Sequence, residues 1–392
     1  MPMNNDAPTD LAKRHLPLYR VIEQNLRERI ESGHWPPGAM LPSRKALADE
    51  YNVDLRTIQR AISDLLADGA LVAHGGRGTF VAHMRAVGEG VAPSAAVQTV
   101  VIIGDPSFNP GPSWTVVVNS IHEGLRGQIE NCRILTVNTS DKSPEGVIRH
   151  EKDALNLAET ERVAGVMMFH AGGEETLPDI RRIMAANIPV VFVDRIPFAH
   201  GCDFVGIDNR MAAREATEYL ISLGHRKIAL LAPDEDVSSI QERMDGYFDA
   251  CMNAGLTTSE DMVFSLAFEK LFAGQTIKSE INRVIGEMMS RPEPPTAVFA
   301  VNDFIAQYLL IALEEQGIAV PKTLSVIGFD DMERFTPQPP KLTTIRQPFE
   351  SIGERAAAML AWRMSHREEP SACQHILLPT RLVVRGSTQP LV

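Results

Sequence analysis

The chain has 392 residues, enough for two or three domains, and its 44% hydrophobic and 22% charged residues are those of an ordinary soluble protein. A net charge of −12 argues against nucleic acid as a partner of the whole surface, but residues 11–85 sum to +3 and residues 86–392 to −13. The sequence shows no secretory signal, no apolar run long enough to span a membrane, and four scattered cysteines without a C-x-x-C pair. We therefore expect a cytoplasmic protein without a metal site or cofactor, in which any contact with nucleic acid comes from the N-terminal part.

The N-terminal part predicts three helices. Residues 1–15 are polar, and we expect a disordered tail there. Apolar residues recur at helical spacing over residues 18–30, which predicts an amphipathic helix. A second helix should begin after Pro42 with Ser43 as its cap, and a third should begin at Asp54 after a short turn. The short turn between the last two helices is typical of a helix-turn-helix.

Behind these helices, two short β-rich runs flank a glycine-rich tip that contains Arg77, a pattern that predicts a β-hairpin over residues 71–81. The third helix leaves Arg56, Thr57, Gln59 and Arg60 on its polar face, and such groups can hydrogen-bond phosphates and base edges in a major groove. A helix pair that serves only core packing is the alternative. The hairpin directly behind the pair argues against it.

Residues 16–82 resemble the winged-helix domain of the GntR family of bacterial transcription regulators. PLYRVIEQNLRERIESGHWPPGAMLPS matches the family's first helix and turn, and GGRGTFV matches its wing. Leu55 and Gln59 stand where the family has arginines that touch DNA, so we expect an operator that departs from the family average. The resemblance implies DNA contacts from Ser43, Arg44, Lys45, Arg56, Thr57, Gln59, Arg60, Gly76, Arg77 and Gly78.

The rest of the chain has the sequence pattern of an α/β protein. Residues 83–97 have the glycines, proline and small residues of a linker, and from Gln98 on β-branched runs alternate with helical segments. Roughly three hundred residues favour two lobes over one very large sheet. Expected strands are residues 99–103, 133–137, 163–169, 190–193, 227–231, 297–301 and 324–328, and expected helices include residues 211–223, 239–254 and 304–316.

A second resemblance covers about residues 98–388. The segments VGIDNRMAAREATEYLISLGHRKIALLA, AVFAVNDFIA, LSVIGFDD and LPTRLVVRGST are similar to the effector domain of the lactose-repressor (LacI) family. The implied fold class is α/β, with an N-terminal winged helix-turn-helix followed by a two-lobed periplasmic-binding-protein-like (type I) domain, residues 98–392, that contains two parallel sheets. The resemblance places crossings between the lobes near residues 205–208, 318–322 and 344–348.

Small molecules in such folds bind at the carboxyl ends of the strands, and between two lobes they are enclosed from both sides. Asp105, Phe169, His170 and Asp194 follow strands of the first lobe. Arg243 and Asp303 align with the family's effector-binding arginine and aspartate, and Trp114 and Phe268 fall near its ligand-contacting aromatics. Alternatives stay open, namely an interlobe salt bridge for the charged pair, packing for His170 and Phe268, and a structural pair of Asp194 with Arg195.

We expect a homodimeric repressor that binds operator DNA and is released when a small effector, a carbohydrate or a related metabolite, enters the interlobe cleft. Corepressor-dependent repression and activation are alternatives within the same class. A cytoplasmic solute-binding protein, or an enzyme that uses the cleft, is an alternative from a different class. The chain shows no phosphate-loop, Gly-x-Ser-x-Gly or His-Glu-x-x-His motif, which argues against the common enzyme classes.

Overall fold

A computed structural model gives the structure of the chain. It describes all residues except 1–17, 32–33, 36–38, 68–70, 75–77, 82–96, 105–111, 138–142, 198–200, 235–236, 257–259, 268–274, 336–338, 368–371 and 392. The chain divides into two compact units, Met1–Ala92 and Pro93–Val392. The expected tail, and the expected linker apart from Val97, lie outside the described residues.

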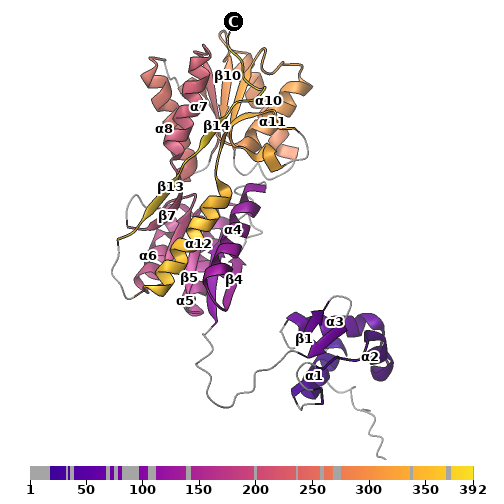
Figure 1. Cartoon of the computed structure of the whole chain (residues 1–392). Coiled ribbons are helices and arrows are strands. Elements are labelled where there is room, and N and C mark those ends of the chain that lie inside the picture. The colour runs from indigo at the N-terminus through magenta and orange to yellow at the C-terminus, as the bar shows by residue number, and fades with distance from the viewer. Residues whose placement is uncertain are drawn as a thin grey trace, which may run out of the picture. The chain divides into compact units, whose positions relative to one another are not determined.

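The first unit is a winged helix (Figure 1), as the sequence predicts. The Ser43 hydroxyl accepts a hydrogen bond from the Ala46 N–H at 3.1 Å, and Asp54 accepts one from the Thr57 N–H at 2.8 Å, so both predicted caps are confirmed. Leu26, Leu47 and Ile58 are fully buried in its small core. The elements are α1 (Leu18–Glu31), α2 (Arg44–Tyr51), α3 (Leu55–Ala67) and the antiparallel pair β1 (Leu71–His74) and β2 (Gly78–Val81).

The first lobe of the second unit is a six-stranded sheet in the order β13-β7-β6-β5-β3-β4, and all its pairings are parallel. Its strands are β3 (Gln98–Ile103), β4 (Cys132–Val137), β5 (Gly165–Met168), β6 (Val190–Val193), β7 (Asp203–Ile207) and β13 (His375–Leu378). Its helices are α4 (Pro112–Gln128), α5 (Pro144–Thr160), the short η1 (Gly173–Thr176), α6 (Leu177–Ala185) and α12 (Phe349–Ser365).

The second lobe has a six-stranded sheet in the order β14-β12-β11-β10-β8-β9, in which β12 pairs antiparallel with β14 and the other pairings are parallel. Its strands are β8 (Ile228–Pro233), β9 (Val263–Leu266), β10 (Ala297–Ala300), β11 (Ser325–Asp330), β12 (Thr343–Arg346) and β14 (Arg381–Val383). Its helices are α7 (Asn209–Ser222), α8 (Ser238–Asn253), η2 (Glu260–Met262), α10 (Gln275–Met289), α11 (Asp303–Glu315) and η3 (Met332–Phe335).

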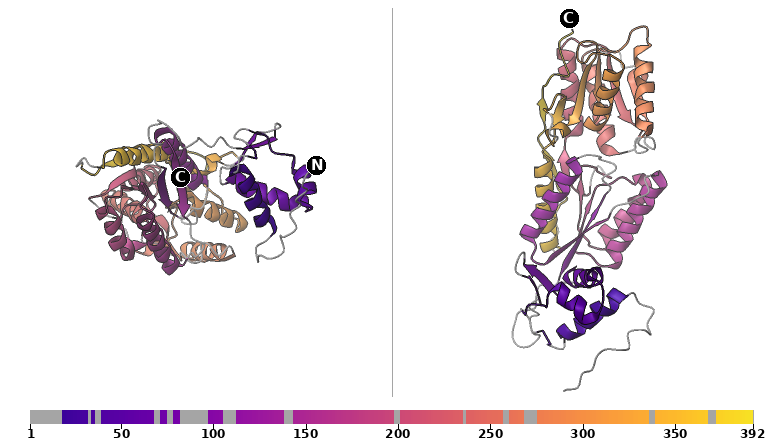
Figure 2. Two further views of the ribbon diagram at one scale, coloured as in Figure 1. Left: turned by 90° about the horizontal axis from the view of Figure 1, so that it is seen from below. Right: turned by 90° about the vertical axis from the view of Figure 1, so that its right-hand side faces the viewer.

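Helices cover both faces of each sheet (Figures 1 and 2), which explains why the strands are apolar along their length. In β3, Val100 and Ile102 pack with α4 and α12, whereas Val101 and Ile103 pack with α5 and α6. The contact between α4 and α12 is close, because a Cβ atom added at Gly353 would lie 2.5 Å from a backbone oxygen of α4. Among the described residues, no helix is long and apolar enough to cross a membrane.

The structure corrects one of the three expected crossings. Residues 318–322 connect α11 to β11, and both belong to the second lobe, so a crossing there is wrong. Gly317, with a φ of 71°, follows the end of α11 and turns the chain back toward β11 within the lobe. The chain passes between the sheets after β7 at Asp208, between β12 and α12 at residues 347–348, and between β13 and β14 at residues 379–380.

Candidate functional site

The carboxyl ends of strands from both sheets meet between the lobes. The Ile196 N–H, just beyond β6 of the first lobe, donates a hydrogen bond to the Ser238 hydroxyl at the start of α8 in the second lobe at 2.9 Å. Helix α4 of the first lobe also contacts η3 of the second. Side chains that follow the strands of either lobe are therefore brought to a common region.

Arg243 on α8 lies at the centre of this region on the second lobe, and only 4% of its surface is exposed. Its Nε donates to Asn209 Oδ1 at 2.9 Å and its Nη1 to the Val301 carbonyl at 2.8 Å. The Phe329 ring lies 3.9 Å beneath the guanidinium carbon. Gly246 allows α8 to approach α7 closely, since an added Cβ would lie 2.2 Å from a backbone oxygen of α7. This close approach places Asn209 beside Arg243 and fixes the guanidinium.

Asp330, at the end of β11, is the carboxylate next to Arg243, with a separation of 3.5 Å between Oδ1 and Nη1. Burial raises the pKa of Asp330 to about 6, although Arg243 and the Gln347 amide act in the opposite direction. The Gln347 Nε2 donates to the same Asp330 oxygen at 2.7 Å. The other amide atom, Gln347 Oε1, is buried and has no hydrogen-bond partner among the described residues.

Asp303 lies beside Asp330 but is fully enclosed. One carboxyl oxygen accepts a hydrogen bond from the Thr344 hydroxyl and the other from the Met332 N–H, each at 2.7 Å. Burial, followed by the neighbouring charge of Asp330, raises the pKa of Asp303 well above its usual range. Asp303 thus connects β12 and η3 to α11, and in this structure its oxygens are occupied by protein donors.

The first lobe contributes two aromatic side chains. Trp114 on α4 and Phe169 after β5 are both almost buried, and their ring centroids lie 4.6 Å apart at an interplanar angle of 57°. Gly104, at the end of β3, makes room for the indole, because an added Cβ would lie 2.5 Å from Trp114 Cη2. Both residues were predicted from the sequence to contact the effector, and the structure places them in contact with each other.

Asp194 and His170, both predicted from their position after strands, differ in their surroundings. Asp194 adopts a left-handed backbone conformation with a φ of 64° and lies 3.7 Å from the Arg195 guanidinium. Burial is the main cause of the raised pKa values of Asp330 and Glu242, and the charge of Asp194 adds to both across the interlobe region. His170 instead lies 3.1 Å from the buried Glu151, which also accepts a hydrogen bond from a threonine of η1. His170 therefore belongs to a polar cluster within the first lobe.

The structure thus brings Arg243 and Asp194 into one polar region and Trp114 into contact with Phe169, while Asp105 and Phe268 lie outside the described residues. Four polar residues of this region were not predicted from the sequence, namely Asn209, Glu242, Asp330 and Gln347. Two of these could have been found by the rule that ligand groups follow strands, because Asp330 ends β11 and Gln347 follows β12. We call Asp194, Asn209, Glu242, Arg243, Asp330 and Gln347 the interlobe cluster.

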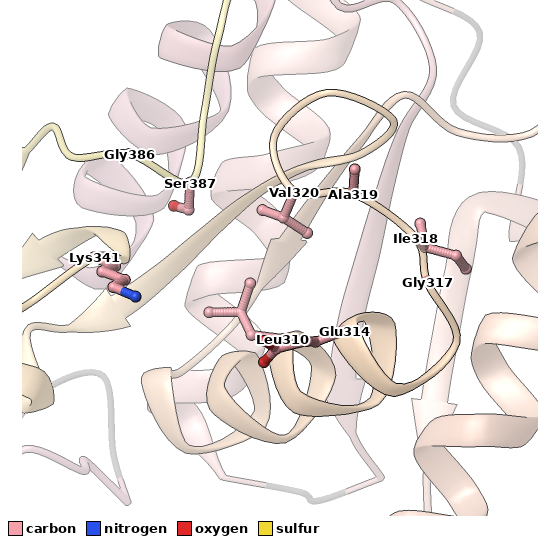
Figure 3. Close-up of a pocket in the computed structure, with 9 residues that line it drawn as sticks. All are labelled: Leu310, Glu314, Gly317, Ile318, Ala319, Val320, Lys341, Gly386 and Ser387. Atoms are coloured by element: carbon pink, nitrogen blue, oxygen red, sulfur yellow. The ribbon is translucent and has the colours of Figure 1, made fainter.

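Two cavities lie elsewhere in the second unit. One of about 510 Å³ lies in the second lobe where α11 turns toward β11 (Figure 3), and the other, of about 520 Å³, lies in the first lobe between α4 and α12. Neither is lined by a residue of the interlobe cluster. The lining of the first is Leu310, Glu314, Gly317, Ile318, Ala319, Val320, Lys341, Gly386 and Ser387.

In the winged helix, the residues expected to contact DNA are mostly exposed. Arg44 and Lys45 begin α2, and Arg56 and Gln59 lie on the open face of α3. The Arg60 guanidinium lies 4.2 Å from the centre of the Tyr19 ring of α1, which limits its motion. Ser43 and Thr57 also serve the helix caps, and Gly78 begins β2, whereas Gly76 and Arg77 lie outside the described residues.

Residues 18–81 match the family described as bacterial regulatory proteins, gntR family, and residues 217–388 match the periplasmic binding protein-like domain. The chain is 27% identical to the arabinose metabolism transcriptional repressor of Geobacillus stearothermophilus, over 97% of this chain and 100% of that protein. It is also 31% identical to the HTH-type transcriptional regulator DegA of Bacillus subtilis, over 62% of this chain and 69% of that protein. The chain belongs to the bacterial transcription regulators that join a gntR-family DNA-binding domain to a periplasmic binding protein-like domain.

The fold of this regulator's second unit is shared with solved structures. A LacI family transcriptional regulator from Enterococcus faecium with bound ribose has a TM-score of 0.61 and 24% identity, over 75% of this chain and 100% of that one. The expected fold class and the expected combination of the two families are thus confirmed.

Proposed function

We propose that this regulator is a cytoplasmic homodimeric repressor that leaves its operator when a sugar-like effector binds between the two lobes. The observation that carries the proposal is Arg243, a buried arginine held by Asn209 and Val301 at the meeting point of the two sheets. The hydrogen bonds of Nε and Nη1 to protein acceptors hold the guanidinium in place, and its Nη2 group can donate hydrogen bonds to hydroxyl oxygens of a polyol. Similarity to arabinose metabolism transcriptional repressors over nearly the whole chain supports the class of ligand.

The proposed effector site joins both lobes. Arg243 and Asp194 would hold the hydroxyl groups, and Trp114 with Phe169 would form the apolar surface for the C–H face of the ring. Asp303, with Asp105 and Phe268 from outside the described residues, completes the proposed set, and Asp303 would act mainly by holding the segment next to Asp330. A ligand that contacts both lobes favours their closed arrangement, and this preference is the free energy available to change the dimer.

The proposed DNA reader is the winged helix. Arg44, Lys45, Arg56 and Arg60 give it exposed positive charge, but its net excess over residues 11–85 is only +3. One copy should therefore bind DNA weakly and with strong salt dependence. Two copies held at a fixed spacing would bind two half-sites together, so an effector that changes the spacing within the dimer would release the operator.

The experiment uses the full-length chain, a DNA fragment selected in vitro with it, and a panel of L-arabinose, D-ribose, cellobiose, common hexoses and their amino and acidic derivatives. A binding member at 100 times its dissociation constant should stabilise the second unit by roughly 2.7 kcal/mol in thermal unfolding. The same compound should lower DNA affinity at constant salt. Stabilisation together with tighter DNA binding would show corepression instead, and a panel without any binding member would overturn the proposed ligand class. No chemical conversion of the bound member is expected.

A further inference from the structure

The interlobe cluster contains a buried acceptor without a donor. Gln347 is 2% exposed, its Nε2 is taken by Asp330 at 2.7 Å, and its Oε1 has no hydrogen-bond partner among the residues that the structure describes. An unsatisfied buried carbonyl costs about 1–3 kcal/mol relative to a bonded one. Something that donates a hydrogen bond is therefore needed at this point. Gln347 lies where the chain passes from β12 to α12, so the missing donor would contact the connection between the lobes.

The same cluster contains a carboxylate without a cation. Glu242 on α8 accepts a hydrogen bond from Asn209 Nδ2 at 3.3 Å, and no cation of the described residues lies within ion-pair distance of it. Arg243, one position further along the helix, directs its Nε and Nη1 to Asn209, Val301 and Asp330. Desolvation by burial, with the charges of Asp194 and Asp208, raises the pKa of Glu242 against the opposing effects of the Asn209 hydrogen bond and the charge of Arg243. Glu242 is thus a half-buried carboxylate in surroundings that disfavour its charge.

The charged side chains around Arg243 carry an excess of negative charge. In the described part of this region, two guanidinium groups, Arg195 and Arg243, face the three carboxylates of Asp194, Glu242 and Asp330, and Asp208 acts on both Glu242 and the guanidinium of Arg210. Such a region repels a carboxylate or phosphate on a ligand and attracts an ammonium group, the more strongly because it is partly desolvated.

We propose that the effector is an amine-bearing polyol, an amino sugar or a related hydroxylated amine, whose ammonium group lies beside Glu242 and which donates a hydrogen bond to Gln347 Oε1. This inference rests on the proposed function and narrows its ligand class. The hydroxyl groups occupy Arg243 and Asp194, and the ammonium group supplies the positive charge that the region lacks. An acidic or phosphorylated sugar places like charge against Glu242 and is rejected.

The test compares matched trios on the full-length chain by isothermal titration calorimetry: glucose, glucosamine and glucuronate, with the corresponding galactose and mannose series. Within at least one trio the amine should bind at least tenfold more tightly than the neutral sugar, and the acid should not bind. Glu242→Gln should reduce the preference for the amine at least tenfold. Glu215→Gln, an exposed change on α7, is the matched control and should retain the preference.

Each outcome decides between the two proposals. A neutral sugar that binds as tightly as its amine, or a preference that Glu242→Gln leaves unchanged, overturns the amine inference and leaves the sugar-responsive repressor standing. An acid as the best member of a trio overturns the amine inference in the same way. If no compound of any trio or of the wider panel binds, the amine inference and the proposed ligand class both fail. Gln347→Leu should weaken binding of the preferred amine at least tenfold, and equal binding by this variant removes Gln347 from the site.

Discussion

The two lobes contribute different chemistry to the same region. The second lobe supplies a network of charged and amide groups, in which Arg243, Asp330 and Gln347 are linked by hydrogen bonds and are almost fully buried. The first lobe supplies Trp114 against Phe169, with Asp194 as the charged group that faces the network. The second lobe therefore holds its polar groups in place before a ligand arrives, and the first lobe contributes the small exposed part of an aromatic pair that is otherwise packed.

This difference assigns separate tasks to the lobes. A prearranged polar network loses little entropy on binding, so the second lobe should determine which ligand binds. Apolar contact with an aromatic ring discriminates little between similar ligands. The first lobe should therefore determine how strongly a bound ligand favours closure of the lobes. Changes in the second lobe should then alter stability and specificity together, whereas changes in the first lobe should alter ligand affinity with little effect on specificity.

The largest effect is expected from Arg243→Ala. Removing one partner of a buried pair leaves Asp330 uncompensated and costs roughly 3–5 kcal/mol of unfolding free energy. Denaturant unfolding of the full-length protein measures the loss in the second unit. Arg243→Lys is the control for charge, because lysine keeps the charge but cannot reach Asn209 and Val301 together. Both variants should lose the effector response, and a lysine variant that keeps it would show that the guanidinium geometry is unimportant.

Variants of Asp303 test whether this residue stabilises the second unit through its hydrogen bonds. Asp303→Ala leaves the Met332 N–H and the Thr344 hydroxyl without their acceptor and should destabilise the second unit by about 2–4 kcal/mol. Asp303→Asn keeps an acceptor for the N–H and offers an amide to the hydroxyl, so it should unfold within about 1 kcal/mol of the parent. Urea denaturation at neutral pH compares the two. An asparagine variant that is as unstable as the alanine variant would contradict a supporting role of Asp303 that rests on its hydrogen bonds to Met332 and Thr344.

Asp330 gives a pH-dependent prediction. Its pKa of about 6 lies above the unfolded value of 3.8, so the folded protein holds this proton more tightly than the unfolded chain. Stability from this group is present below pH 3.8 and is lost as the pH rises toward 6. Asp330→Asn removes that loss. Between about pH 4 and pH 7 the stability of the variant relative to the parent should therefore rise by up to about 3 kcal/mol, by the relation of 1.36 kcal/mol per pKa unit. This change adds to a pH-independent cost of leaving Arg243 without its carboxylate. Thermal unfolding at both pH values measures it, and a difference that does not change with pH would refute the assignment.

The smallest effect is expected in the first lobe. Gly104→Ala places a Cβ 2.5 Å from Trp114 Cη2, so the indole must shift and the variant should lose about 1–2 kcal/mol. Ligand affinity should fall while the ranking of ligands stays the same. Gly127→Ala on α4 is the matched control, because nothing lies within 4 Å of its added Cβ, and it should be neutral or slightly stabilising. A changed ligand ranking in Gly104→Ala would break the division of tasks between the lobes.

Much of the fold follows from local signals in the sequence. The caps at Ser43 and Asp54 and the apolar strands such as β6 are properties of short segments, and the structure has them where the sequence predicts them. Strands β7, β9, β12, β13 and β14 were not predicted, and of these β12 and β14 pair with each other across more than thirty residues. The crossing expected at residues 318–322 was wrong, because Gly317 and Pro321 belong to a turn between α11 and β11 within one lobe.

Some residues of the candidate site could be predicted from the sequence and others could not. Arg243, Asp303 and Trp114 were predicted through family resemblance, and Phe169 and Asp194 through their place after strands. Gln347 carries no local signal of its own, because its significance depends on Asp330, seventeen positions earlier, taking one amide atom and leaving the other without a donor. A buried unsatisfied atom exists only in three dimensions, and the sequence cannot predict it.

The most direct measurement is the release of a labelled operator fragment from the full-length protein, followed by fluorescence anisotropy during titration with the preferred member of the sugar panel. Parent protein and Arg243→Lys should bind the fragment with the same affinity in the absence of ligand. The parent should release it as ligand is added, and Arg243→Lys should retain it at a hundredfold higher concentration. Release of both proteins at the same ligand concentration would contradict the claim that Arg243 at the interlobe site controls the DNA-binding domain.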